Sequence, residues 1–349
     1  IGIAKKKGTN AVTVARQIFR RLDELKPQLP PGVEVAVTRN VSDGVNSIAW
    51  AFPFREGDNV VVALGAEHPN NVYPWLRLQR RGVELRVVAT PDGRIEPDAM
   101  RDAMDSRTRM MSAASVSFAP GYRTDLGRLG EICVKRDVLL LIDGVQSAGI
   151  LHHDIAKQPV SALATSTSKG LLGLYGYGFL YVEEKWLDRL EPAYLSRTGV
   201  DVGNDDASSM GEWTYRLQAD ARRFELGSYN LAGAYAADAA LAILLDFGTR
   251  TIERHVLELA ARLCEGLKSL GLPVTQPRSE AERSHIVTCG ALDNGGHGFS
   301  NDPRISALYK QLTESGVVLT LRRGQLRFGI HLYNNEDDID RVLRIVAEQ

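Results

Sequence analysis

The segment from Val138 to Val182 decides the fold, and it reads VLLLIDGVQSAGILHHDIAKQPVSALATSTSKGLLGLYGYGFLYV. It begins with an apolar run that ends at Asp143, and a short apolar run bounded by an acid and a glycine predicts a strand buried in a parallel sheet. Lys169 follows 26 residues after this acid, within a cluster of serines and threonines. Open α/β sheets bind ligands at the carboxyl ends of their strands, so we expect Asp143 to face such a crevice.

A lysine brought to the same crevice indicates a specific chemistry. A lysine with a lowered pKa can form a Schiff base, and an acid can bind the protonated nitrogen of a pyridine ring. Lys169 and Asp143 are therefore the two protein groups that a pyridoxal phosphate site needs. The pair alone is a weak signal, because an Asp-Gly step is more often part of a turn and a lysine more often a solvated surface residue.

The rest of the chain alternates between apolar runs and amphipathic stretches, which predicts an α/β fold with a mainly parallel sheet and helices on both faces. We assign residues 1–246 to this large cofactor-binding domain and residues 247–349 to a smaller C-terminal α+β domain. The predicted strands of the large domain are 33–37, 59–64, 83–89, 108–118, 138–142, 162–165 and 179–182, and its helices are 11–26, 45–52, 71–81, 96–104, 126–135 and 230–246. The predicted strands of the small domain are 285–289, 317–321 and 325–330, and its helices are 251–270, 305–315 and 336–347.

Composition limits the classes of partner. The 349 residues carry a net charge of −1, which gives no reason to expect a nucleic acid or an anionic membrane. No apolar run approaches the roughly 20 residues of a membrane span. The three cysteines form neither a metal-binding pattern nor a disulfide framework, so we expect a cytoplasmic protein without a metal site. The chain starts with Ile1, so we expect that an N-terminal piece of the large domain is missing.

A second short motif lies near the start of the large domain. A predicted strand leads into Thr38-Arg39-Asn40-Val41-Ser42-Asp43-Gly44 and then into a helix, for which Asn40 or Ser42 is a suitable N-cap. Small polar residues that open a helix after a strand can bind phosphate, because free backbone N–H groups and the helix dipole face the anion. Most such residues only cap a helix, so this signal too needs its context.

Six motifs in this order resemble the class V aminotransferases, which are pyridoxal-phosphate enzymes of fold type I that include cysteine desulfurases and isopenicillin N epimerase-like proteins. The resemblance covers nearly the whole chain from about residue 10. The motifs are residues 38–44, Glu67-His68-Pro69-Asn70-Asn71-Val72-Tyr73-Pro74-Trp75, Asp143-Gly144-Val145-Gln146, Ser166-Thr167-Ser168-Lys169, Arg223-Phe224-Glu225-Leu226-Gly227-Ser228-Tyr229-Asn230, and Leu326-Arg327-Phe328-Gly329-Ile330-His331-Leu332-Tyr333-Asn334.

The resemblance implies roles around the ring of the cofactor. Lys169 would form the Schiff base, an aldimine, and would then move the proton at the Cα atom of an amino-acid substrate. Asp143 would pair with the pyridine nitrogen, and Gln146 would bind the phenolate oxygen. His68 would stack on the ring face, as the third catalytic residue.

The resemblance also implies how the phosphate and the substrate are bound. Val41, Ser42, Ser166 and Ser168 would contact the phosphate, and Ser228 would reach the phosphate of a neighbouring subunit, which predicts a homodimer with sites at the interface. The substrate carboxylate would bind one of two arginines. Arg327 is the first candidate, because a planar guanidinium suits a carboxylate, and Arg322 is the second.

Two departures from the commonest pattern bear on the reaction. Ser168 stands where cysteine desulfurases usually have a histidine, and no cysteine lies between Arg322 and Arg327, where persulfide-forming desulfurases carry one. We therefore expect an aminotransferase-like enzyme outside the persulfide-forming branch. A C–S β-lyase, an amino-acid epimerase and a cofactor-free α/β binding module stay open as alternatives. The residues that select the substrate are not evident, although loop 196–213 with Arg197 is a candidate.

Overall fold

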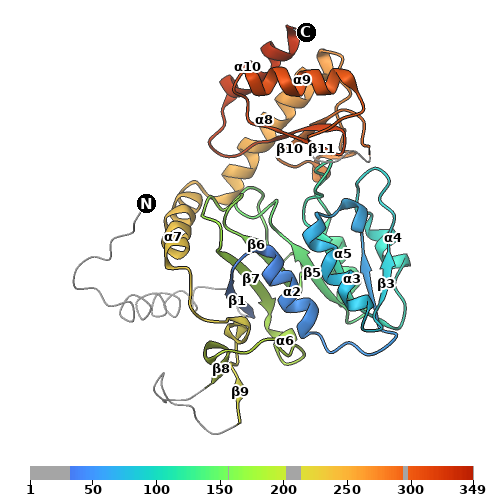
Figure 1. Ribbon diagram of the computed structural model, residues 1–349, viewed down its shortest axis with the longest axis vertical. Helices are drawn as coiled ribbons and strands as arrows, with labels where there is room; N and C mark the ends of the chain where they lie inside the picture. Colours follow the sequence, from blue (N-terminus) through green and yellow to red (C-terminus); the bar gives the residue numbers. More distant parts are fainter. Residues whose placement is uncertain (1–31, 156, 202–213, 294–297, 349) are drawn as a thin grey trace, which may run out of the picture.

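The computed structural model describes residues 32–155, 157–201, 214–293 and 298–348. Within these ranges the chain forms a seven-stranded sheet, a three-stranded sheet and a two-stranded ribbon. Figure 1 shows the three-stranded sheet with helices α8 (Thr249–Ser269), α9 (Pro303–Glu314) and α10 (Glu336–Ala347) at one end of the long axis. The seven-stranded sheet lies in the middle, and the two-stranded ribbon of β8 (Val200–Asp201) and β9 (Arg216–Leu217) lies at the other end. The predicted helix 11–26 and most of loop 196–213 lie outside the described residues.

The large sheet has the strand order β1-β7-β6-β5-β4-β2-β3. Neighbouring strands from β6 to β3 are parallel, whereas β7 is antiparallel to both β6 and β1. The mainly parallel sheet is thus confirmed, with one reversed strand near its edge. The strands are β1 (Val33–Thr38), β2 (Asn59–Val62), β3 (Glu84–Val87), β4 (Thr108–Ala114), β5 (Leu139–Asp143), β6 (Ala162–Ser166) and β7 (Gly178–Glu183).

Both faces of this sheet are covered, which explains the unbroken apolar run of β5. Leu139 and Leu141 belong to one hydrophobic core, together with residues of α2 (Val41–Ala51) and α3 (Tyr73–Gln79). Leu140 and Ile142 point the other way, into a second core with α4 (Pro97–Asp102) and α5 (Leu126–Val134). A strand buried on both faces has no position at which a polar side chain is favoured. The first polar residue, Asp143, therefore marks the end of the strand.

The C-terminal part is built around a third core. Helix α7 (Leu231–Phe247) and helix α8 (Thr249–Ser269) meet at Gly248 with a bend of 79°. Strand β12 (Gln325–Gly329) pairs in antiparallel fashion with β10 (Ile286–Cys289) and β11 (Thr320–Arg322), and α8, α9 (Pro303–Glu314) and α10 (Glu336–Ala347) pack on this sheet. The same core includes Val116, Ile150 and Leu171 from the large-sheet region. The division into residues 1–246 and 247–349 stays a proposal.

Some predicted boundaries differ from the structure for local reasons. The predicted strand 108–118 ends at Ala114, and 317–321 becomes the short β11. Residues 196–201 were expected to be irregular, but they contain a 3₁₀ turn, η4 (Arg197–Gly199), and β8 (Val200–Asp201), which pairs with β9 (Arg216–Leu217). The remaining short elements are α6 (Glu184–Leu187), η2 (Leu64–Ala66), η3 (Pro69–Asn71), η5 (Ala221–Phe224) and η6 (Glu280–Glu282).

No single helix in the described ranges is long and apolar enough to cross a membrane. Helices α7 and α8 meet the length and composition criteria only as a pair, and that pair is the one bent at Gly248.

Candidate active site

The predicted ring-binding residues lie where the chain order of the large sheet reverses. From β2 the chain continues outward to β3, while β4, β5 and β6 follow one another on the other side, so β2 and β4 flank a topological switch point. Ligands of such sheets bind beyond the carboxyl ends of the strands at this point. Asp143 is the last residue of β5, Lys169 follows the end of β6, and His68 follows η2 beyond β2.

Strand register brings the two halves of the predicted phosphate site together. Gly178 at the start of β7 pairs with Thr38 at the end of β1 and with Ser166 at the end of β6. A Cβ atom at Gly178 would lie 2.4 Å from the Thr165 carbonyl oxygen and 3.0 Å from Thr38 Oγ1. Only glycine therefore allows the three strand ends to approach this closely, and the N-terminus of α2 follows directly from β1.

The first turn of α2 has the geometry expected of an anion site. Of the two candidate caps, the structure selects Asn40, whose Oδ1 accepts a hydrogen bond from the Asp43 backbone N–H at 2.9 Å. Ser42 is then not the cap, so its hydroxyl and the Val41 backbone N–H stay available to a phosphate. The carboxylate of Asp43 in the same turn is paired with Arg39 at 2.9 Å, which reduces its repulsion of an anion.

The other two predicted phosphate ligands differ in exposure. Ser168 is half-buried beside Lys169, whereas Ser228 is exposed. Ser228 has a φ of +52°, a left-handed conformation that is unusual for a residue with a side chain. Within the described part of the chain it forms no hydrogen bond with the other predicted phosphate ligands.

Asp143 is buried at the carboxyl end of β5. Its Oδ1 accepts from the Val145 backbone N–H at 2.7 Å, and its Oδ2 accepts from Asn71 Nδ2 at 2.7 Å. Burial raises the pKa of Asp143, while the Val145 N–H group and the charge of Lys169 oppose that shift. In the described residues no Lys, Arg or His lies within ion-pair distance of Asp143, so the carboxylate is short of a cation.

The Lys169 side chain is exposed to solvent, but protein atoms crowd its ammonium, which interacts with the charges of Asp143, Arg327 and Arg322. Desolvation lowers the pKa of the Lys169 ammonium, Asp143 raises it, and the positive charges of Arg327 and Arg322 lower it. A lowered pKa increases the fraction of neutral amine, which is the nucleophilic form. The predicted Schiff-base lysine and the predicted acid are therefore close enough for their charges to interact.

His68 lies between η2 and η3, beyond the carboxyl end of β2, and its role as a ring-stacking residue stays a prediction. Its Nδ1 accepts from the Asn70 backbone N–H at 3.2 Å, which leaves the proton of the neutral imidazole on Nε2. Its ring meets the ring of Phe118 edge to face, with centroids 4.9 Å apart. Burial and then the charges of Lys169 and Arg322 lower the pKa of His68, so the imidazole is neutral at neutral pH.

Arg327 approaches Gln146 and Lys169 from the small sheet. Its Nη2 donates to Gln146 Oε1 at 3.2 Å, and its guanidinium carbon lies 5.9 Å from the centroid of Phe118. Burial and the neighbouring charge of Arg322 lower the pKa of Arg327 to about 10, which leaves it cationic at neutral pH. Its Nε is buried without a hydrogen-bond partner, and no carboxylate in the described ranges pairs with Arg327 or Arg322. Both arginines are thus available to an anion.

These residues fit pyridoxal phosphate. A buried carboxylate lacks a cation where a protonated pyridine nitrogen would lie, and a helix N-terminus with serines lies where a phosphate would bind. Lys169, His68 and Gln146 would hold the carbonyl, the ring face and the phenolate oxygen respectively. No group of three or more metal-ligating side chains occurs in the described residues.

Three residues of the site were not assigned a role from the sequence. Glu67 and Asn71 lie in the same motif as His68, and both are buried beside Asp143. Phe118, which contacts both His68 and Arg327, follows β4 after its pairing has ended. The buried acid directly before His68 was a usable signal, whereas the position of Phe118 requires knowledge of the strand order.

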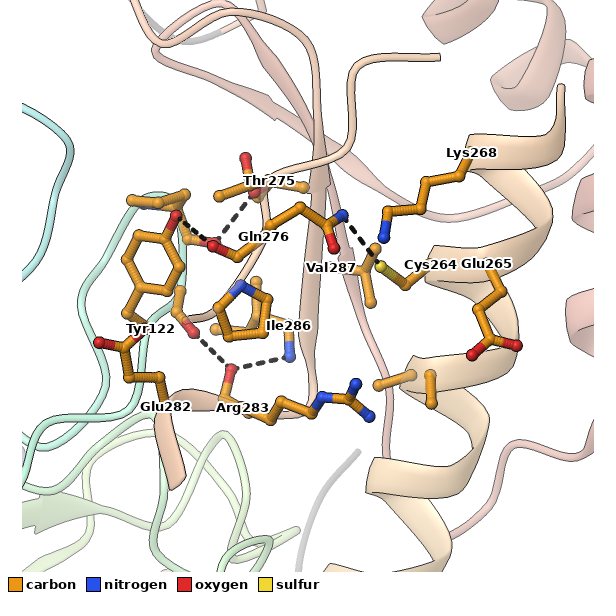
Figure 2. Close-up of a pocket in the computed structure, with 17 residues that line it drawn as sticks. Tyr122, Cys264, Glu265, Lys268, Thr275, Gln276, Glu282, Arg283, Ile286 and Val287 are labelled. Carbon is orange, nitrogen blue, oxygen red and sulfur yellow. Dashed lines mark hydrogen bonds between the residues drawn. The ribbon is translucent and has the colours of Figure 1, made fainter. Parts of the chain in front are cut away.

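The cavity in Figure 2 is a separate feature. It has a volume of about 100 Å³, lies between α8 and β10, and is lined by none of the predicted site residues. Cys264 borders it, with its Sγ accepting from Gln276 Nε2 at 3.4 Å, while Cys133 and Cys289 are buried. The hairpin between β11 and β12 consists of Arg323 and Gly324, so no cysteine of the described residues projects from it.

The chain matches known proteins over nearly its whole length. The family model for "Aminotransferase class-V" matches residues 28–342. A probable cysteine desulfurase of Methanothermobacter thermautotrophicus is 32% identical, over 95% of this chain and 84% of the relative. An uncharacterized aminotransferase of Schizosaccharomyces pombe is 28% identical, over 90% of this chain and 76% of the relative.

Solved structures agree in fold. The apo cysteine desulfurase of Thermococcus onnurineus superimposes with a TM-score of 0.81 at 24% identity, covering 98% of this chain and 86% of the other. The cystine C–S lyase C-DES, in complex with its product cysteine persulfide, gives a TM-score of 0.83 at 20% identity, covering 98% and 90%. The predicted fold class is confirmed, and a cofactor-free binding module is no longer a suitable description.

One prediction from the sequence is contradicted by these relatives. We expected the chain to lie outside the persulfide-forming desulfurases, but several relatives are named cysteine desulfurase, at identities of 32% or less. The prediction relied on a missing cysteine in the hairpin between Arg322 and Arg327. The missing cysteine means only that this hairpin carries no thiol that could accept the sulfur. It does not bear on whether the enzyme cleaves the C–S bond.

Proposed function

The chain belongs to the class-V aminotransferase family and is a pyridoxal-phosphate-dependent enzyme, and from this premise we propose that it cleaves the C–S bond of cysteine or of an S-substituted cysteine. The names of the curated relatives support this choice. The observation that carries it is electrostatic. A neutral imidazole, His68, lies within the fields of Lys169 and Arg322, so the crevice is positive where a leaving thiolate would carry negative charge.

The chain's own residues divide the chemistry. Arg327 binds the α-carboxylate and orients the Cα–H bond toward Lys169. Lys169 takes the Cα proton, and the C–S bond breaks with its electron pair going to sulfur. The Nε2–H group of His68 and the charge of Arg322 stabilise that thiolate until it receives a proton from the Lys169 ammonium. Bound pyridoxal phosphate supplies the electron sink that makes the Cα proton acidic.

Product analysis tests this proposal. Purified holoenzyme is incubated with L-cysteine, L-cystine or an S-alkyl cysteine, and sulfide, persulfide, alanine and pyruvate are measured. We expect release of a sulfur product together with pyruvate and ammonia, because the bond breaks with its electron pair going to sulfur. Alanine would form only where an added thiol accepts the sulfur, so alanine instead of pyruvate would contradict the mechanism given above. A new amino acid formed from a 2-oxo acid without sulfur release would establish transamination instead. Deuterium at Cα with loss of chirality would establish epimerisation, and either result contradicts C–S cleavage.

We further propose that the active unit is a homodimer in which Ser228 completes the phosphate site of the other subunit. Ser228 is exposed and has a left-handed backbone conformation. The nearby Glu225 carboxylate accepts from the Val37 backbone N–H at 2.8 Å and from the hydroxyl of Tyr229, the residue after Ser228. Helix α7, three residues further on, exposes four large apolar side chains: Tyr235, Ile243, Leu245 and Phe247. Exposed apolar side chains of this size are typical of a helix face that is covered by another chain.

A mixing experiment tests the dimer. Ser228→Asp should impair phosphate binding in the partner's site by charge repulsion, and Lys169→Ala should inactivate its own site. Mixed dimers of the two variants contain one intact site, so activity should reappear on mixing and subunit exchange. A failure to regain activity, with mixed dimers demonstrated by mass spectrometry, would contradict the shared site.

A further inference from the structure

A buried pair of carboxylates lies below the crevice. Glu67 is 9% exposed, Asp143 is 6% exposed, and Asn71 between them is 1% exposed. Asn71 Nδ2 donates to Glu67 Oε2 at 2.9 Å and to Asp143 Oδ2 at 2.7 Å. One amide therefore bridges the two acids, and in the described residues no cation forms an ion pair with either of them.

The second carboxylate is fixed by the sheet itself. Glu67 Oε1 accepts from the backbone N–H of Ala114 at 2.6 Å, and Ala114 is paired in register with Asp143 across β4 and β5. The Glu67 carboxylate is therefore held one strand away from Asp143. It is anchored to backbone, so it can in turn fix the Asn71 amide.

The orientation of the Asn71 amide is also determined. Both N–H groups of the amide go to carboxylate oxygens, while its Oδ1 is buried without a hydrogen-bond partner. Rotating the amide by half a turn would place Oδ1 against two carboxylates, which is repulsive. Without Glu67, nothing in these contacts would hold the second N–H group.

We propose that Glu67 is a positioning residue. It acts through Asn71 to hold the Asp143 carboxylate in the orientation that meets the pyridine nitrogen. When the two acids cannot both be ionised, Glu67 is the one that carries the proton. Two buried carboxylates in contact with one amide disfavour two negative charges. Consistent with this, burial and the charge of Asp143 raise the pKa of Glu67 to about 7, while the hydrogen bonds from Asn71 and Ala114 oppose the rise. Protonation of Glu67 leaves Asp143 free to stay ionised. The inference rests on the cofactor and is independent of which bond the enzyme cleaves.

The experiment uses holoenzyme and apoenzyme of four proteins: wild type, Glu67→Gln, Glu67→Ala and Asn71→Ser. Affinity is measured by titrating pyridoxal phosphate into the apoenzyme, and the visible absorbance of the bound cofactor is recorded between pH 5 and about 9. We expect Glu67→Ala and Asn71→Ser to weaken cofactor binding by about 10- to 100-fold, as supporting residues do in other sites. Glu67→Gln keeps only one acceptor oxygen, and using it for Asn71 turns the NH2 group toward the Ala114 N–H group. It should therefore bind more weakly than wild type but more tightly than Glu67→Ala, and it should lose the pH dependence of absorbance near pH 7.

A matched control separates positioning from general stability. Asp58 is also a buried acid, 6% exposed, and it forms an ion pair with Arg109 at 3.1 Å. It directly precedes the amino end of β2, whereas Glu67 lies beyond the carboxyl end of that strand. Asp58→Asn should lower the melting temperature without changing cofactor affinity or its pH dependence. Wild-type affinity and an unchanged pH profile in Asn71→Ser overturn the proposal, even if the Glu67 variants fail to fold. The same holds if Asp58→Asn reproduces the effects of Glu67→Ala.

Discussion

The two halves of the active site are prepared to different degrees. On the large sheet, Asp143 and His68 have their hydrogen-bond partners in place, supplied by Asn71, Val145 and Asn70. On the small sheet, Arg327 makes one side-chain hydrogen bond, and its Nε is buried without a partner. In the proposed site, the large sheet would then hold the cofactor, which stays bound. The small sheet would offer a cation to the substrate carboxylate, which binds and leaves in each turnover.

The largest test of this comparison is the removal of Lys169 from the large-sheet half. Lys169→Ala should lower kcat by at least about 10³-fold, because it removes the group that moves the Cα proton. The cofactor should still bind, but borohydride should no longer attach it to the protein, as judged by mass spectrometry. Lys157→Ala, a change at an exposed lysine, is the control. A reducible link in Lys169→Ala would mean that another lysine forms the Schiff base.

The second test is directed at the small-sheet half. Arg327→Ala should raise KM for the amino acid by roughly 30-fold or more, since a buried charge pair with the substrate carboxylate is lost. Cofactor affinity should change far less, because the phosphate and ring contacts are on the other sheet. Arg304→Ala, at an exposed arginine of α9, should leave both constants unchanged. Equal losses of substrate and cofactor affinity in Arg327→Ala would show that the two halves do not work separately.

A smaller effect is expected at the ring face. His68→Ala removes a stacking contact worth about 0.5–1.5 kcal/mol, so pyridoxal phosphate should bind about 2- to 12-fold more weakly. The control is His255→Ala. The Nε2 atom of His255 is hydrogen-bonded to the carbonyl oxygen of Asn334 in the C-terminal part of the chain. If cofactor affinity is unchanged in His68→Ala, His68 does not stack on the ring.

The smallest effect concerns the pH dependence of stability in the large-sheet half. The pKa of Glu67 is raised to about 7 in the folded protein, so the folded state binds more protons than the unfolded state between roughly pH 4.5 and 7. The Glu67 contribution to the free energy of unfolding is therefore present at low pH and is lost as the pH rises through about 7. The melting temperature of wild-type apoenzyme should fall over this range relative to Glu67→Gln. Parallel curves for the two proteins would contradict the raised pKa.

Sequence reasoning was correct about the position of candidate residues that lie at the end of a secondary-structure element. Asp143 ends a fully buried strand, and Lys169 follows the next one, as the local pattern predicted. The bridge from Glu67 to Asp143 depends on two contacts between residues that are distant in the sequence. Glu67 and Ala114 are separated by 47 positions, and Asn71 and Asp143 by 72, and no local pattern encodes such contacts. The reversed strand β7 was missed for the same reason, because its direction depends on pairing and not on composition.

The hydrogen bond between Arg327 and Gln146 also has an entropic consequence. An arginine side chain loses up to about 2 kcal/mol of rotamer freedom when it is fixed in one conformation. Gln146 and the ring of Phe118 already restrict Arg327 before any substrate arrives, so most of that loss occurs during folding and not during binding. Loosening Arg327, for example through Phe118→Leu, would therefore weaken substrate binding without removing a single contact to the substrate.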